Sequence, residues 1–150
     1  MFKKFFIPAD DSDITSMALA VLRVWLGLTM FFNHGLGKLA AFNDTVANFP
    51  DPLGIGQEAS VMLVIFAEVA GALLLAVGFL TRIAALTLVI DMFVAFLMVH
   101  KTALNGQGSG ELAFLYLAGF VTILIAGGGT FSTDMVMFGK KSARKPAAQN

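Results

Sequence analysis

Four long apolar stretches, separated by short polar segments, set the pattern of the chain. They cover residues 14–34, 59–80, 83–100 and 111–126. An α-helix rises about 1.5 Å per residue, so about 20 apolar residues cross the roughly 30 Å hydrocarbon core of a bilayer. The pattern therefore predicts an all-α integral membrane protein, built as one antiparallel bundle of four helices. The fourth stretch is the shortest and is expected to tilt little.

Two of the segments between these stretches predict how the helices are joined. Thr81-Arg82 interrupts the apolar pattern so briefly that the second and third helices are expected to be antiparallel neighbours. Residues 39–57 combine a candidate interfacial helix with a loop rich in proline and glycine. The first two helices are therefore predicted to be linked by a longer, surface-lying connection.

The C-terminal part of the chain predicts a short surface helix and a tail. Three glycines at 127–129 end the fourth apolar stretch. Ser132 or Thr133 can cap a small helix over residues of about 132–139, which makes residues 1–139 one membrane domain. Residues 140–150 are polar and basic and are predicted to be a tail outside this domain.

The basic residues between the stretches predict an orientation, because basic loops favour the cytoplasmic side of a membrane. If both termini are cytoplasmic, Lys38 and Lys101 are the basic residues outside. The inner side then holds Lys3, Lys4, Arg82, Lys140, Lys141, Arg144 and Lys145. This bias predicts both termini in the cytoplasm, and an even number of spans agrees with it.

Composition narrows the possible functions. Hydrophobic residues make up 57% of the chain and charged residues 13%, against about a quarter charged in soluble domains. A formal net charge of zero gives no reason to expect nucleic-acid binding. The chain has no cysteine, which excludes disulfides, thiol chemistry and protein-held iron–sulfur clusters. Electron transfer would therefore need an organic cofactor, a haem or a partner subunit.

Polar residues inside the apolar stretches are the candidates for chemistry. Arg23 and Asp91 fall at similar depth in the inner half of two helices, and burying either alone is costly, so we expect a structural ion pair between them. Glu68 falls near the middle of the second helix, and a mid-membrane carboxylate is a functional candidate by default.

A second group of polar residues is expected at the outer end. It consists of His34, Lys38, His100 and Glu111, with Glu68 below them. We expect these five side chains to contact a ligand and Glu68 to face His34 as a proton relay. Phe31 is expected to cover a bound ring. Lys38 is also typical of a headgroup anchor.

The positions of Asp91 and His100 conflict with a single face of the third helix, and the two histidines raise the question of a metal or haem site. Asp91 and His100 are nine residues apart, so they point in opposite directions on a straight helix. Either the third helix ends before His100, or one of the two residues faces elsewhere. The histidines and carboxylates come from separate helices without a paired ligand motif, so no metal site is predicted. Two histidines on one side would suit a haem, but the wheel conflict weighs against it.

Several segments in order along the chain resemble the DoxX family. They are LRVWLGLTMFFNHGLGKL, FAEVAGALLLAVGFLTRIAAL, His100, the Gly-Glu at the start of the fourth helix, and GGGTFSTD. The spacing E-x-x-G-x6-G-x-x-T-R-x-A is the most specific part. By motif, the recurring family positions are Arg23, Gly27, His34, Gly35, Lys38, Glu68, Gly71, Gly78, Thr81, Arg82 and Glu111.

The resemblance implies a four-helix protein of a bacterial cytoplasmic membrane. It also implies a relation to small subunits of quinol oxidase and thiosulfate:quinone oxidoreductase. We therefore expect a membrane subunit of a redox-linked complex that binds a quinone-like molecule or supports an oxidoreductase partner, and that is not catalytic alone. Its partners would be the lipid bilayer, an oxidoreductase subunit and further copies of itself. A proton-coupled transporter and a scaffold without chemistry stay open as alternatives.

Overall fold

The computed structural model describes residues 13–139, and this part of the chain contains helices and no strand. The predicted tail at 140–150 and the lysines at positions 3 and 4 lie outside the described residues. Three helices are long and apolar enough to cross a membrane, and the helix α8 (Glu111–Ala126) is apolar but shorter. The prediction of an all-helical chain with several apolar helices of membrane-spanning length is therefore confirmed for these residues.

Each of the three long helices combines α-helical and π-helical segments. The first consists of α2 (Asp13–Met30), η1 (Phe31–Gly35) and α3 (Leu36–Ala40). The second consists of α5 (Gln57–Ile65), η2 (Phe66–Gly71) and α6 (Ala72–Val77). The third consists of α7 (Thr81–Val94) and η3 (Ala95–Val99). A π-helical segment holds an extra residue in its turn and often lies at a functional site.

Three further helices complete the described chain. They are the connecting helix α4 (Phe42–Asn48), the fourth apolar helix α8 (Glu111–Ala126) and the short α9 (Thr133–Phe138). The hydroxyl of Ser132 accepts a hydrogen bond from the amide of Met135, so Ser132 is the cap of α9. The predicted surface helix after the glycines is therefore present, and α4 is the helix expected in the 39–57 connection.

The turn between the second and third helices is not at the expected place. Thr81-Arg82 begins α7, and the turn is formed by residues 78–80. Gly78 and Leu80 have φ values of 72° and 48°, in the left-handed region. Gly78 ends α6 at low cost because it has no Cβ. The apolar Phe79 and Leu80 gave this turn the appearance of a continuing helix in the sequence.

Close packing at glycines holds the first helix against the second. A Cβ built on Gly27 would lie 2.7 Å from the carbonyl oxygen of Ala72, and one on Gly35 would lie 2.6 Å from that of Glu68. Gly71 allows the same approach to Thr87 on α7, where a Cβ would be 2.8 Å from the hydroxyl. Small residues allow helices in a membrane to pack by backbone contact.

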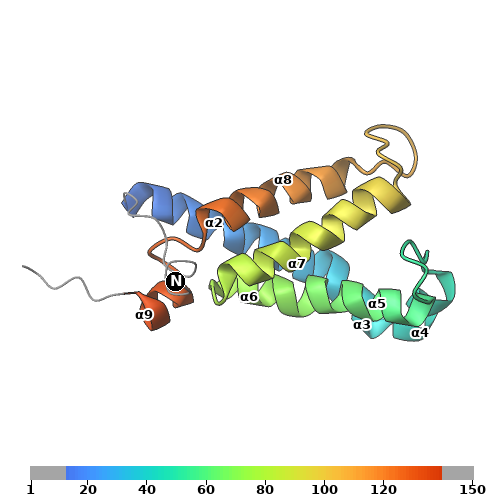
Figure 1. Ribbon diagram of the computed structural model, residues 1–150, viewed down its shortest axis with the longest axis horizontal. Coiled ribbons are helices and arrows are strands. Elements are labelled where there is room, and N and C mark those ends of the chain that lie inside the picture. The colour runs from blue at the N-terminus through green and yellow to red at the C-terminus, as the bar shows by residue number, and fades with distance from the viewer. Residues whose placement is uncertain (1–12, 140–150) are drawn as a thin grey trace, which may run out of the picture.

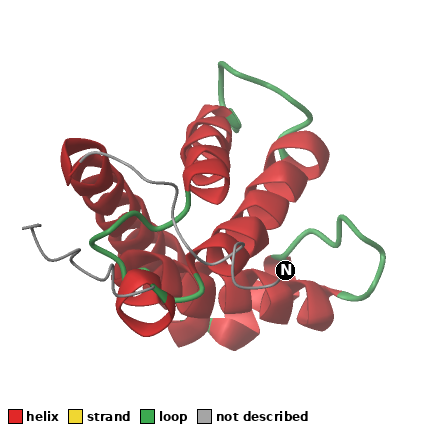
Figure 2. Ribbon diagram, turned by 60° about the vertical axis from the view of Figure 1, so that its left-hand side comes forward, coloured by secondary structure: helices red, strands yellow, loops and turns green. Residues whose placement is uncertain are grey.

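The helices pack tightly at one end of the molecule and part at the other. α7 packs against α6 and η2, while α5 continues away from it (Figure 1). α8 covers α7 along its length, and α2 lies between α6 and α8. Figure 2 shows the longer loops extending outward from the helix ends. The molecule therefore has a closed end, at the 78–80 turn and α9, and an open end, at α4 and the 100–110 loop.

Candidate functional site

A cavity of about 640 Å³ lies at the open end. Its wall is mostly apolar and includes residues from the three long helices, from α8 and from the 49–53 loop. The polar side chains of its wall are those of His34, Lys38, Ser60, Glu68, Thr87, Asp91, His100, Ser109 and Tyr116. Ligand pockets are typically apolar cavities of several hundred Å³ with a few polar groups, and this cavity has that character.

An ion pair between Lys38 and Glu68 forms one polar part of the wall. The ammonium of Lys38 donates to both carboxylate oxygens of Glu68, at 2.8 Å to Oε1 and 2.6 Å to Oε2. The Glu68 side chain is only 4% exposed, and that of Lys38 is 26% exposed. The carboxylate is therefore buried with a counter-charge, as expected for an ionisable residue within a membrane helix.

The local structure of two helices explains how this pair forms. Lys38 and Glu68 lie on different spans, next to η1 and in η2. Gly35 brings the first helix against the backbone of Glu68 itself. The long side chain of Lys38 then folds back along the apolar surface to reach the carboxylate, as lysine stems do.

His34 does not pair with Glu68 as the sequence led us to expect. Lys38 holds both oxygens of Glu68, while the imidazole of His34 packs edge-on against Tyr116, with ring centroids 5.6 Å apart. His34 still lines the cavity. The sequence analysis missed Tyr116, although this single tyrosine of the chain lies within an apolar helix, which is a signal that its hydroxyl needs a polar surrounding.

The predicted outer cluster is partly assembled. His100 lines the cavity, and its Nδ1 donates to the carbonyl oxygen of Gly108 at 2.7 Å. Glu111 is exposed at the start of α8 and is absent from the cavity wall. Phe31 is also absent from the wall, and Phe49 and Phe66 are the aromatic residues other than Tyr116 that line it.

The prediction of an ion pair between Arg23 and Asp91 is wrong. The guanidinium of Arg23 donates to the carbonyl oxygens of Ala76, at 2.7 Å, and of Phe131. Asp91 instead lines the cavity, within electrostatic range of Glu68 and Lys38, and its Oδ2 is buried without a hydrogen-bond partner among residues 13–139. Depth along two helices does not determine which way each side chain points.

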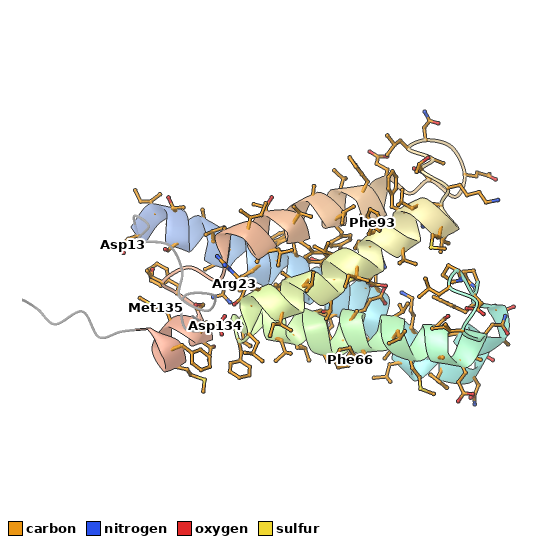
Figure 3. The ribbon with its side chains drawn as sticks, viewed as in Figure 1. Asp13, Arg23, Phe66, Phe93, Asp134 and Met135 are labelled. Carbon is orange, nitrogen blue, oxygen red and sulfur yellow. The ribbon has the colours of Figure 1, made fainter. Side chains whose placement is uncertain are left out.

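Side chains at the closed end bind the free backbone groups at the ends of helices. These interactions explain what the polar residues at this end do. Arg23 binds carbonyl groups at the end of α6, and Arg82 donates to the carbonyl of Ile125 near the end of α8 at 3.1 Å. The carboxylate of Asp134 accepts from the amides of Leu80 and Thr81, at 2.7 and 2.8 Å. Figure 3 shows Arg23 and Asp134 facing this turn from opposite sides. Cations at helix C-termini and carboxylates at N-termini are both stabilising.

The loop that covers the open end is fixed by Asp51. Its carboxylate accepts from the amides of Gly56 and Ile55, at 2.8 and 3.1 Å, and from the hydroxyl of Ser60 at 2.8 Å. The hydrogen bond from Gly56, followed by that from Ser60, lowers the pKa of Asp51. Asp51 thus holds the loop residues Phe49 to Leu53 in the cavity wall at the start of α5.

The positions of the histidines and carboxylates bear on the question of a metal or haem site. Among the described residues 13–139, no three histidine, aspartate or glutamate side chains are grouped so that they could share a metal ion. His34 and His100 line the same cavity, but one packs on an aromatic ring and the other is bound to a backbone carbonyl.

The fold and the cavity define a multi-pass helical membrane protein with an internal, largely apolar chamber. The sequence profile of the DoxX family matches residues 18–101, more than half of the chain, and the protein belongs to this family. A protein of Haemophilus influenzae described as uncharacterized is 31% identical over 132 residues, which is 81% of this chain and 92% of that protein. No solved structure matched the chain.

Proposed function

We propose that this DoxX-family protein is the membrane subunit of a redox-linked complex and that its cavity binds a quinone-like small molecule. One observation carries the proposal: an apolar cavity of about 640 Å³ with an ion pair and several polar groups in its wall. A bundle that served only as a scaffold would be expected to fill this space with side chains, because protein interiors are close-packed.

The apolar wall favours a ligand that is dissolved in the bilayer. Leu63, Phe66 and Ile90 line the cavity and are each more than half exposed on the outside of the bundle. They lie where the second and third helices part, so a ligand could enter sideways from the lipid. The tail of a quinone would meet these residues, and its ring would meet Phe49, Tyr116 and the polar groups.

The protein would not supply electrons itself. It has no cysteine, which excludes a redox-active thiol pair and a protein-held iron–sulfur cluster. An oxidoreductase partner, and further copies of this chain, would complete the complex in the cytoplasmic membrane of a bacterium. With both termini in the cytoplasm, the cavity would open toward the outer side.

A proton-coupled transporter is the second candidate. It is favoured by the buried Lys38–Glu68 pair next to the unpaired Asp91, since ionisable groups inside a membrane protein often mark a proton pathway. Proton flux in sealed vesicles that depends on an added solute would support this candidate against the quinone-binding proposal.

Quinone binding can be tested with a variant that fills the cavity. The protein in lipid nanodiscs is titrated with a benzoquinone that carries a short isoprenoid tail, and binding is followed by equilibrium dialysis. Ala113 is buried and lines the cavity, so Ala113→Phe should abolish saturable binding. Ala118 is exposed on the same helix, so Ala118→Phe is the matched control and should bind like the wild type. Absence of saturable binding to the wild type, or equal binding to a folded Ala113→Phe variant, would contradict the proposal.

A further inference from the structure

Asp91 is the second carboxyl group of the cavity wall, besides Glu68, and the Lys38–Glu68 pair does not explain its role. It lies on α7, its side chain contributes to the cavity wall, and its Oδ2 is buried without a hydrogen-bond partner in the described chain. A buried polar atom without a partner is rare in folded proteins and calls for an explanation. Its position in the wall of a mostly apolar chamber suggests that the partner is a ligand.

The charges around Asp91 limit the form in which it can be present. Lys38 is the lysine of the cavity wall, and its ammonium already contacts both oxygens of Glu68. The two together carry no net charge, so nothing remains to neutralise Asp91. The other titratable groups of the wall are those of His34, His100 and Tyr116. His34 packs against Tyr116, and the proton of the His100 Nδ1 is taken by the carbonyl of Gly108.

An ionised Asp91 would therefore be a buried charge beside a second carboxylate. Such a charge costs several kcal/mol in an apolar surrounding, and a carboxyl group avoids this cost by keeping its proton. A protonated carboxyl has one O–H donor. This gives the cavity a neutral hydrogen-bond donor, which is a different chemistry from that of the ion pair.

We propose that Asp91 is a neutral carboxylic acid before a ligand binds and recognises the ligand by donating a hydrogen bond to one of its acceptor oxygens. The inference rests on the proposed function for the place where the ligand binds, and it adds the residue and the ligand chemistry. The preferred ligand is a bilayer-soluble molecule with a carbonyl oxygen. The Lys38–Glu68 pair stays closed and shapes the wall. No electron or proton leaves Asp91 in this recognition step.

The protonation state is tested first, without any ligand. Infrared spectra of the protein at neutral pH should contain the C=O stretching band of a protonated carboxylic acid. This band should be absent in Asp91→Asn and unchanged in Asp44→Asn, which alters an exposed carboxyl group on α4. A spectrum without such a band, or a band that persists in Asp91→Asn, would overturn the proposal.

Ligand recognition is tested with two probes that share a carbonyl group. One is the short-tailed benzoquinone, and the other is an alkyl ketone of similar length that cannot accept electrons. Asp91→Leu removes the donor and keeps the branched shape and the number of side-chain heavy atoms, so it should weaken binding about tenfold, the effect of one lost hydrogen bond. Asp91→Asn keeps an N–H donor and should bind within about threefold of the wild type. Binding should also shift the infrared band of Asp91.

The outcomes separate this inference from the proposed function. If the quinone binds equally well to the wild type and to Asp91→Leu, the role of Asp91 is wrong while quinone binding stands. If the ketone binds through Asp91 and the quinone does not bind, the proposed function is wrong while the donor role stands. If an alkyl ammonium ion of similar length binds in place of both, Asp91 is ionised and the inference is overturned. Binding of none of these probes would overturn both proposals.

Discussion

At the scale of single residues, Lys38 and Glu68 differ in what each could do without the other. Glu68 is 4% exposed and would stay buried in the protein, whereas Lys38 is 26% exposed and has a flexible stem. A lysine near the end of a membrane helix can turn its ammonium toward the surface. A glutamate enclosed by η1 and η2 has no such alternative. The cost of breaking the pair therefore depends on which partner is removed.

This asymmetry predicts unequal effects of two substitutions. Lys38→Met leaves Glu68 as an uncompensated buried carboxyl group and should lower stability by about 3 kcal/mol or more. Glu68→Gln keeps the shape of the site, and Lys38 can then reach the surface, so its effect should be about 1 kcal/mol. Thermal unfolding in lipid nanodiscs measures both.

The double variant provides the internal control. Lys38→Met combined with Glu68→Gln removes both charges and should be more stable than Lys38→Met alone. Equal losses from the two single variants, or strictly additive losses in the double variant, would show that the pair does not determine stability. Glu68→Gln should also abolish any redox or transport activity while the fold is kept.

The sequence identified four of the nine polar residues of the cavity wall but not their partners. His34, Lys38, Glu68 and His100 all line it, because polar residues in apolar helices avoid lipid. Similar depth and the cost of burying either charge alone predicted a pair between Asp91 and Arg23. The true partners of Arg23 are backbone carbonyls of α6 and of the loop before α9, and no side-chain pattern reports free carbonyls.

At the scale of helices, the π-helical segments change which residues face the cavity. On a straight α-helix, nine residues place Asp91 and His100 about 180° apart. η3 lies between them, and its π-helical turn takes up one residue more than an α-helical turn. The two side chains are therefore related as if they were about eight residues apart on an α-helix, which is an angle of about 80° around the helix axis. The third helix also ends at Val99. Both side chains therefore line one cavity, and the predicted conflict disappears.

The same irregularity could not be predicted from the apolar pattern. η1, η2 and η3 consist of ordinary apolar and small residues around His34 and Glu68. The helices themselves were predictable, since length and hydropathy determine whether a segment can span a bilayer. The positions of the π-helical segments depend on how each helix packs against its neighbours. The sequence of one helix alone does not determine this packing.

A prediction at this scale concerns the contact between the first two helices. A Cβ on Gly35 would lie 2.6 Å from the carbonyl oxygen and 2.8 Å from the carbonyl carbon of Glu68, so Gly35→Ala must push the helices apart. Overpacking of this kind costs about 1–3 kcal/mol. The variant should unfold at lower temperature and bind the short-tailed quinone more weakly, because Lys38 and Glu68 move apart.

Gly37 is the matched control for this substitution. It lies two residues away and is exposed, and a Cβ there would meet no atom within 4 Å. Gly37→Ala should leave binding unchanged and raise stability by up to about 1 kcal/mol, because alanine loses less backbone entropy in a helix. Equal behaviour of the two variants would show that close backbone approach at Gly35 is unimportant.

At the scale of the whole molecule, the two ends differ in construction. The closed end is rich in capping interactions, with Arg23, Arg82 and Asp134 bound to the ends of three helices. The open end has the cavity and the longer connections. If the basic residues determine the orientation as proposed, the closed end lies toward the cytoplasm and the cavity toward the outer side.

This orientation can be measured with reporter fusions. Alkaline phosphatase is active outside the cytoplasmic membrane and green fluorescent protein folds inside. Alkaline phosphatase inserted in the 49–56 loop should be active, and green fluorescent protein fused to the C-terminus should fluoresce. Finding both positions on the same side would contradict the three spans predicted between the first connection and the C-terminus.

The cap that Asp134 provides for α7 also has a consequence for the order of biosynthesis. The carboxylate that binds the amide of Thr81 lies 53 residues further along the chain. While the ribosome is still making the fourth helix, the second and third helices can already be in the bilayer, but their connecting turn lacks its cap. Asp134 of α9, which is made after the fourth helix, therefore completes this turn. A nascent protein that stops before Asp134 would keep an unfinished end exposed to quality-control proteases.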